Sequence, residues 1–256
     1  QQLKLVLPIG HTDKIYDAQF SPDGKKFITC GDITAKLWDV PTGELLANLE
    51  GHKQGIYATL ISPDNKRIIT ASSDETARLW ESSTGTTLSI MNVMCGNIPD
   101  YIPVFSPDGK LIMNIANNTY MENFSITCYR AEEGDSIAVI QNPDGEIERA
   151  FFTTDSKRIV IFSKINNPKI WDVASGKLLD SLVGFDTSAY ARFYAGDGQK
   201  MATFSNNGKS VIWNISTGKA LASLQEPALE ITSTLFSRNG KIMVTLTDNG
   251  IAKAWD

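Results

Sequence analysis

The apolar residues of this chain fall in short runs that alternate with polar turns. One run covers residues 66–70, and the polar turn at 72–75 separates it from a second run that ends at Trp80. Short runs rich in β-branched and aromatic residues are typical of β-strands. No segment shows a sustained apolar period of about 3.6 residues, which a helix would need. The pattern therefore predicts an all-β chain essentially without helices.

One aromatic position recurs along the whole sequence. A tryptophan followed by an acidic or amide residue marks five repeats, and a tyrosine marks the sixth. These marks are Trp38, Trp80, Tyr129, Trp171, Trp213 and Trp255, with successive spacings of 42, 49, 42, 42 and 42 residues. A period of this size indicates stacked supersecondary units. We expect a single domain over 1–256, with approximate repeats at 10–50, 51–91, 92–140, 141–182, 183–224 and 225–256 plus 1–9.

Landmarks around each mark divide the repeat into four strands, which we name a, b, c and d in chain order. After the mark, a glycine and then an aliphatic residue predict a tight turn between strands c and d. The aliphatic positions are Leu46, Leu88, Ile137, Leu179 and Leu221. Before the mark, an apolar residue precedes a turn such as Ser21-Pro22-Asp23-Gly24 and ends strand a. These apolar positions are Phe20, Ile61, Phe105, Phe152, Tyr194 and Phe236.

With these landmarks the chain resembles the WD-repeat family of β-propellers over its whole length. Gly10-His11 to Trp38-Asp39 and Gly51-His52 to Trp80-Glu81 match the family pattern well, and spacing carries the match in later units. The regular Ser-Pro-Asp-Gly turns look similar to those of bacterial WD-repeat proteins. The resemblance implies a propeller of six four-stranded blades, in which an amino-terminal strand over residues 3–7 completes the last blade. Seven blades, or a fragment of a longer array, are the alternatives.

Composition excludes some classes of partner. A net charge of −5 and an isoelectric point near 5.2 argue against a nucleic-acid surface, which needs clustered Lys and Arg. No apolar run approaches the roughly 20 residues that span a bilayer. The chain opens without Met, so we expect it to be processed or trimmed. The cytoplasm is favoured as its compartment, with export after signal-peptide removal as the alternative, and the oligomeric state stays open.

The family resemblance implies a buried hydrogen-bond network in the two best-matched units. It joins the His of Gly-His, an Asp six residues before the Trp, a Ser or Thr on strand b, and the Trp. The second unit offers His52, Ser72 or Thr70, Asp74 and Trp80, and the first offers His11, Thr29, Asp32 and Trp38. Because this spacing repeats with the fold, we interpret these residues as structural rather than as a catalytic Ser-His-Asp arrangement.

Other chemical motifs are missing from the sequence. We expect no catalytic residue, no metal and no cofactor, because there is no Gly-rich phosphate loop, paired-Cys motif or nucleophile elbow. Cys30, Cys95 and Cys128 lie at unrelated places in the repeat and indicate neither a disulfide framework nor a zinc site. Residues 132–135 form an acidic c–d turn, which we interpret as solvated, with cation binding as the alternative.

The strongest functional signal is a recurring tyrosine. In the propellers that this chain resembles, the d–a and b–c loops meet on one face around the central channel. The residue four before the end of strand a lies near that face, and these positions hold Tyr16, Tyr57, Tyr101, Glu148, Tyr190 and Thr232. Tyrosine combines a rigid apolar ring with a polar tip, as binding anchors do. Packing of an inherited Tyr against the neighbouring blade is the alternative.

The third unit is longer than its siblings. Phe105 to Tyr129 spans 24 residues where the other units have 18 or 19, which predicts about five extra residues in a polar b–c loop over 117–123. Two further residues fall in the d–a loop near 94–97. Both insertions lie on the predicted tyrosine face, where loops on a rigid scaffold commonly bind partners. Neutral drift in a surface loop is the alternative.

Together these features predict a non-enzymatic scaffold that binds a protein or peptide, and no nucleic acid, on the top face. Tyr16, Tyr57, Tyr101 and Tyr190 are the predicted anchors, flanked by Tyr120 and Met121, with Lys14, Asp100 and Glu148 as a polar rim. One alternative is a regulatory or sensor domain of a larger bacterial protein with its effector elsewhere. The other, less well supported, is a small-ligand-binding or enzymatic propeller.

Overall fold

The structure is a computed structural model. It describes residues 10–11, 14–93, 102–118, 123–163, 166–182, 189–194, 200–205, 209–215, 217–225, 231–237 and 241–255. The chain divides into two compact units, residues 1–141 and 142–256, which we treat separately.

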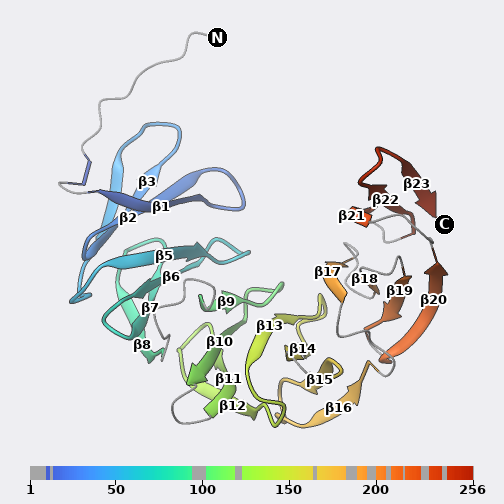
Figure 1. Cartoon of the computed structure of the whole chain (residues 1–256). Coiled ribbons are helices and arrows are strands. Elements are labelled where there is room, and N and C mark those ends of the chain that lie inside the picture. The colour runs from blue at the N-terminus through green and yellow to red at the C-terminus, as the bar shows by residue number, and fades with distance from the viewer. Residues whose placement is uncertain are drawn as a thin grey trace. The chain divides into compact units, whose positions relative to one another are not determined.

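In the first unit, twelve strands form three four-stranded antiparallel sheets (Figure 1). The first sheet holds β1 (Ile15–Phe20), β2 (Lys26–Gly31), β3 (Thr34–Asp39) and β4 (Leu45–Leu49). The second holds β5 (Ile56–Ile61), β6 (Arg67–Ser72), β7 (Thr76–Glu81) and β8 (Thr87–Asn92). The third holds β9 (Val104–Phe105), β10 (Leu111–Asn118), β11 (Asn123–Arg130) and β12 (Ser136–Gln141).

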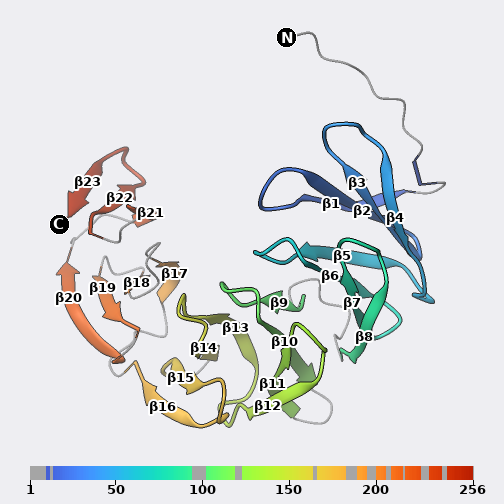
Figure 2. The same ribbon diagram turned by 180° about the vertical axis from the view of Figure 1, so that it is seen from behind.

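In the second unit, two four-stranded sheets precede a three-stranded one (Figure 2). The first of these holds β13 (Ile147–Phe152), β14 (Arg158–Ser163), β15 (Lys169–Asp172) and β16 (Leu178–Ser181). The next holds β17 (Ala189–Tyr194), β18 (Lys200–Ser205), β19 (Lys209–Asn214) and β20 (Lys219–Gln225). The last holds β21 (Ile231–Phe236), β22 (Met243–Thr247) and β23 (Ala252–Trp255).

In every sheet each strand pairs with its neighbours in the sequence, as expected for strands a, b, c and d. Each strand a ends at its predicted apolar landmark. The glycine after each mark has the left-handed backbone that the tight turn requires, with φ of +71° at Gly85 for example. No described residue lies in a helix, so the predicted all-β class is confirmed.

The number of blades stays a prediction. The described residues form six sheets, and the last of them shows three strands. The strand predicted over 3–7 lies outside the described residues. The predicted closure of the last blade by that strand is therefore a proposal, as is the total of six blades.

The core of the first unit lies between neighbouring sheets. Ile28 and Leu37 of the first sheet pack with Ile56, Ile68 and Trp80 of the second in one buried cluster. A further cluster joins the second sheet to the third. Burying each of these large side chains contributes about 1.5–3 kcal/mol. Both faces of β6 are buried: Ile68 packs in the first cluster and the next residue, Ile69, in the second, because successive side chains of a strand point to opposite faces.

Each sheet contains irregular pairings that recur at equivalent places. In five sheets one residue of strand a is skipped in the pairing with strand b, which makes a β-bulge. In the five four-stranded sheets a second bulge lies on strand d, beside the marking aromatic residue. The skipped residues on strand d are the predicted aliphatic positions, Leu46, Leu88, Ile137, Leu179 and Leu221.

The structure of the third sheet corrects the sequence prediction of a long b–c loop. β10 and β11 have eight residues each, and their ladder continues to the pair Asn118–Asn123. Asn117 pairs with Phe124 in the same ladder. Part of the surplus therefore extends a hairpin, because antiparallel pairing satisfies the backbone groups that a loop would leave open. The loop tip at 119–122 lies outside the described residues.

Candidate partner-binding surface

The predicted tyrosine position coincides with the bulge on strand a. The skipped residues are Tyr16, Tyr57, Glu148, Tyr190 and Thr232. A bulged residue has no ladder partner of its own, and the local kink changes the direction of its side chain. Repeat spacing located these positions, whereas the bulge itself was not predicted.

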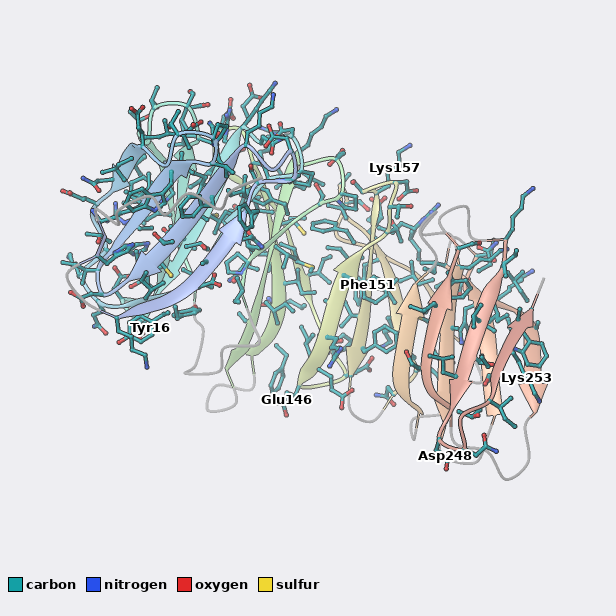
Figure 3. All side chains as sticks on the ribbon, turned by 90° about the horizontal axis from the view of Figure 1, so that it is seen from above. Tyr16, Glu146, Phe151, Lys157, Asp248 and Lys253 are labelled. Atoms are coloured by element: carbon teal, nitrogen blue, oxygen red, sulfur yellow. The ribbon has the colours of Figure 1, made fainter. Side chains whose placement is uncertain are left out.

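Tyr16 and Tyr57 differ in how much surface they offer. Tyr16 is 59% exposed at one end of β1, and the Lys14 ammonium lies 5.6 Å from its ring centroid (Figure 3). That cation–π contact keeps a positive charge beside the exposed ring. Tyr57 is half-buried, and its hydroxyl oxygen is buried. Of the two, Tyr16 is the more accessible anchor.

In the second unit, Glu148 is exposed at the bulge of β13, as expected for a polar rim. Tyr190 lies at the bulge of β17. Figure 3 shows Glu146 and Lys157 at opposite ends of the sheet that contains β13, so the d–a and a–b turns occupy different ends. Asp100, Tyr101, Tyr120 and Met121 lie outside the described residues, and their predicted roles stay predictions.

Two residues that sequence analysis missed hold the surface in place. The Asp17 carboxylate accepts hydrogen bonds from the Thr59 backbone N–H at 3.0 Å and from its hydroxyl at 3.1 Å. The Gln19 side-chain oxygen accepts one from the Ile61 N–H at 3.2 Å. These bonds join β1 to β5. No signal in the sequence pointed to them, because Asp17 has no acidic counterpart in the other units.

The second sheet, in the first unit, contains a continuous hydrogen-bond chain. The Trp80 Nε1–H donates to Thr70 Oγ1 at 2.9 Å, and Thr70 Oγ1 lies 2.7 Å from His52 Nε2. His52 Nδ1 lies 3.0 Å from Asp74 Oδ2. A neutral His52 that donates from Nδ1 and accepts at Nε2 satisfies every member. Thr70, rather than Ser72, therefore supplies the hydroxyl.

The electrostatics of this chain favour a neutral histidine beside a charged carboxylate. Burial lowers the pKa of His52, and this outweighs the opposing effect of Asp74. Burial alone would raise the pKa of Asp74, but hydrogen bonds from Thr76, the Lys53 backbone and His52 hold it well below its usual range. At neutral pH the network therefore contains a neutral His52 and a charged Asp74.

This geometry does not form a nucleophilic triad. Ser72 Oγ donates to the Gln54 carbonyl at 2.8 Å and not to His52. The hydroxyl that does contact His52 belongs to Thr70, which has no exposed surface. A nucleophile must reach a substrate, so these residues act structurally.

The first sheet has a shorter version of the network. Thr29 Oγ1 lies 2.9 Å from His11 Nε2 and accepts the Trp38 Nε1–H at 2.8 Å. Asp32, predicted as the fourth member, is exposed and contributes no side-chain bond to the network in the described part of the chain. The β2–β3 turn is one residue shorter than the β6–β7 turn, so Asp32 falls at its tip, with φ of +45°. The prediction for Asp32 is wrong for this reason.

The later sheets keep only part of the network. Trp213 donates to Thr203 at 2.9 Å, and Trp255 donates to Thr245 at 3.0 Å. In the fourth sheet Ile161 occupies the hydroxyl position, and the buried Trp171 N–H has no acceptor among the described residues.

In that fourth sheet a different contact joins the loop before β13 to the residues that follow β14. The Lys169 ammonium lies 2.7 Å from the Asp144 carboxylate, which also accepts a bond from Asn166 at 3.0 Å. Asn142 donates to Ser163 at 2.9 Å nearby. Loop anchoring is thus retained with other residue types.

The acidic c–d turn of the third sheet is partly neutralised by one arginine. Arg130 lies 3.0 Å from Asp135 and 3.7 Å from Glu133. The described residues contain no group of side chains that could hold a metal ion. The described part of the chain also contains no helix whose length and apolar character would let it cross a membrane.

Comparison with known proteins identifies the repeats. The WD40 family model, described as "WD domain, G-beta repeat", matches residues 2–39 and 43–81. Eukaryotic translation initiation factor 3 subunit I of Candida glabrata is 26% identical over 131 residues, which is 51% of this chain and 37% of that protein. The same subunit of Debaryomyces hansenii is 26% identical over 155 residues, or 60% of this chain and 43% of that protein.

A third relative matches more closely over a shorter stretch. Denticleless protein homolog B of Xenopus laevis is 44% identical over 46 residues, or 18% of this chain and 6% of that protein. The chain thus spans less than half the length of these three relatives. All three are eukaryotic, so the expected similarity to bacterial WD-repeat proteins is not supported.

The fold is shared with a solved structure. The C-terminal WD40 domain of Sif2 has a TM-score of 0.64 and 20% identity, and the match covers 94% of this chain and 66% of that one. Two repeats that match the family model, the four-stranded antiparallel sheets and this likeness agree. Residues 2–39 and 43–81 are therefore similar to WD40 repeats, and the chain shares the fold of the Sif2 domain.

Proposed function

We propose that this protein is a non-enzymatic scaffold, and that the end of its sheets where the strand-a bulges lie binds a protein or peptide. The observation that carries the proposal is the recurrence of tyrosine at a bulge. Tyr16, Tyr57 and Tyr190 occupy this position in three sheets. Bulges commonly re-aim side chains beside functional sites. WD40-repeat proteins generally act as interaction scaffolds.

The surroundings of Tyr16 support an anchoring role. Its ring is more than half exposed, while Asp17 and Gln19 fix the strand that carries it. A rigid aromatic ring loses little conformational freedom on binding, which favours affinity. Lys14 places a positive charge beside this ring in the first unit. A partner with an apolar residue flanked by polar groups would complement this surface.

The partner class follows from the relatives. Some of these relatives are subunits of assemblies by their printed names, such as eukaryotic translation initiation factor 3 and the THO complex. We propose by analogy that the partner is another protein of an assembly.

The test is affinity capture with a matched control. The Tyr16→Ala, Tyr57→Ala, Tyr190→Ala variant is compared with Leu46→Ala, Leu179→Ala, Leu221→Ala, which removes three exposed side chains from strand d instead. Loss of a partner only from the tyrosine variant, with circular dichroism unchanged, would support the surface. Anchors of this kind contribute about 2 kcal/mol each. Equal capture by both variants and the wild type would refute the proposal.

A second candidate is a regulatory domain within a longer protein. The matched relatives are considerably longer than the aligned part, which favours this candidate. Finding an effector domain in the same open reading frame would support it, and the two candidates are compatible at the level of the surface.

A further inference from the structure

At the opposite end of the first unit, the turns of the second and third sheets enclose a pocket of about 410 Å³. It lies where the a–b turns at 62–66 and 106–110 meet the c–d turn at 131–135. The strand-a bulges lie at the other end of the same strands, because β5 begins beside Tyr57 and ends at Ile61. The pocket is therefore separate from the proposed partner surface.

The equivalent junction between the first and second sheets is bridged by side chains. Asn65 accepts a hydrogen bond from the Asp23 backbone N–H at 3.3 Å. The Lys26 ammonium donates to the Ser82 carbonyl at 2.9 Å and approaches its hydroxyl at 3.4 Å. These contacts cross from one sheet to the next and bridge the turns.

At the junction between the second and third sheets, two small residues replace the side chains that form these bridges. Gly109 stands where Asn65 stands one unit earlier, and Ala131 stands where Ser82 does. A Cβ placed on Gly109 would lie 3.5 Å from the Asp64 carboxyl carbon, so a side chain there would point into the pocket. Arg67, the counterpart of Lys26, bonds Glu81 of its own sheet at 2.8 Å instead. The pocket is open for these reasons.

The lining of the pocket is basic. Among the lining residues, Lys66, Arg67, Lys110 and Arg130 contribute four positive charges and Asp64 and Glu132 two negative ones, a net charge of 4 − 2 = +2. This contrasts with the net charge of −5 on the whole chain. Glu81 and Asp135, which pair with the two arginines, lie outside this lining.

The two lysines are the cations left for a ligand. Arg67 and Arg130 already pair with carboxylates. Among the described residues, neither Lys66 nor Lys110 has a carboxylate within ion-pairing distance, and both are exposed. Asp64 is committed internally, since it accepts bonds from the Ser62 hydroxyl at 2.6 Å and the Lys66 N–H at 3.0 Å.

We propose that this pocket binds a phosphate-class anion through the ammonium groups of Lys66 and Lys110. A compact, multiply charged oxyanion suits two lysines, which act as mobile point charges. The anion is either free or attached to a peptide as a phosphate monoester. The site does not depend on the proposed tyrosine surface.

Two variants separate charge from space. Lys66→Gln/Lys110→Gln removes the two free charges. Gly109→Asn/Ala131→Ser transplants the side chains of the first junction and leaves the charge unchanged. Asn is tolerated at this backbone, because Asn65 has φ of +62° and Gly109 has φ of +72°. The control Lys25→Gln/Lys53→Gln removes two exposed lysines elsewhere.

Binding is measured on the full 256-residue chain by amide NMR shifts at constant ionic strength. Inorganic phosphate is titrated in one arm and a short phosphoserine peptide in the other. We expect saturable shifts at Gly109 and Ala131 in the wild type and in the control. The lysine variant should bind about 25-fold more weakly, since each of the two ammonium groups contributes about a fivefold effect near the surface. The Gly109/Ala131 variant should lose the shifts.

The outcomes are distinguishable. Tighter binding of the peptide than of inorganic phosphate would assign the anion to a phosphorylated partner, and equal binding would assign it to a free anion. The absence of saturable shifts in the wild type would overturn the proposal. So would binding that both pocket variants retain.

Discussion

Replacing Thr70 with Val tests the buried network most directly. The substitution keeps the shape of the side chain and removes only the hydroxyl, which joins His52 at 2.7 Å to Trp80 at 2.9 Å. Two buried polar groups then lose their partner at once. Each orphaned group costs about 1–3 kcal/mol, so we expect a total loss of about 2–6 kcal/mol.

Thr203→Val is the matched control in another sheet. Thr203 accepts the Trp213 N–H at 2.9 Å, and no histidine contact is described for it. One orphaned donor predicts a loss of about 1–3 kcal/mol. Both threonines are almost fully buried, so water cannot replace either bond at low cost.

Urea and thermal unfolding, followed by tryptophan fluorescence, measure both changes. For a domain of this size each kcal/mol lowers Tm by about 2–4 °C. The reasoning predicts a clearly larger shift for Thr70→Val than for Thr203→Val. Equal shifts would refute it, because the bond to His52 would then contribute nothing to stability.

Three further predictions follow from burial and backbone geometry. Because burial lowers the pKa of His52 below its usual 6.5, the unfolded chain binds protons more readily; stability should fall as pH drops below about 6.5, with a smaller slope in His52→Gln, as urea titrations at pH 5–8 would show. Gly134→Ala should cost about 1–3 kcal/mol in thermal unfolding, because φ is +74° and the new methyl would clash with Ser89. Burial raises the pKa of the Cys30 and Cys128 thiols to about 12, so neither should react with a thiol reagent until the protein is denatured.

The repeated parts of this fold could be predicted from the sequence. Every repeat contains similar turn residues, so an ambiguous boundary in one repeat can be assigned by alignment with the others. The end of strand a at Phe20 and the turn glycine at Gly85 were both placed correctly. The positions equivalent to Tyr16 and Leu46 could be located, because they lie at fixed offsets in each repeat. The bulges at these positions were not predicted, because a bulge has no residue signature of its own.

Features that occur in one unit only were not predictable. Asp17 bridges two sheets, yet nothing repeats at its position, so periodicity gave no signal. Asp32 fitted the family spacing but falls at the tip of a shorter turn. The surplus of the third unit was assigned to a loop, because counting residues cannot distinguish a longer loop from a longer hairpin such as β10–β11.

The bulges on strand d have a consequence for solubility. Strand d is the last strand of its sheet, and its outer edge has unpaired backbone groups that another chain could extend. A bulge interrupts the spacing of those groups, so an incoming strand could match only one half of the edge at a time. The protein can therefore expose the side chains of Leu46, Leu179 and Leu221 without offering a continuous template for aggregation.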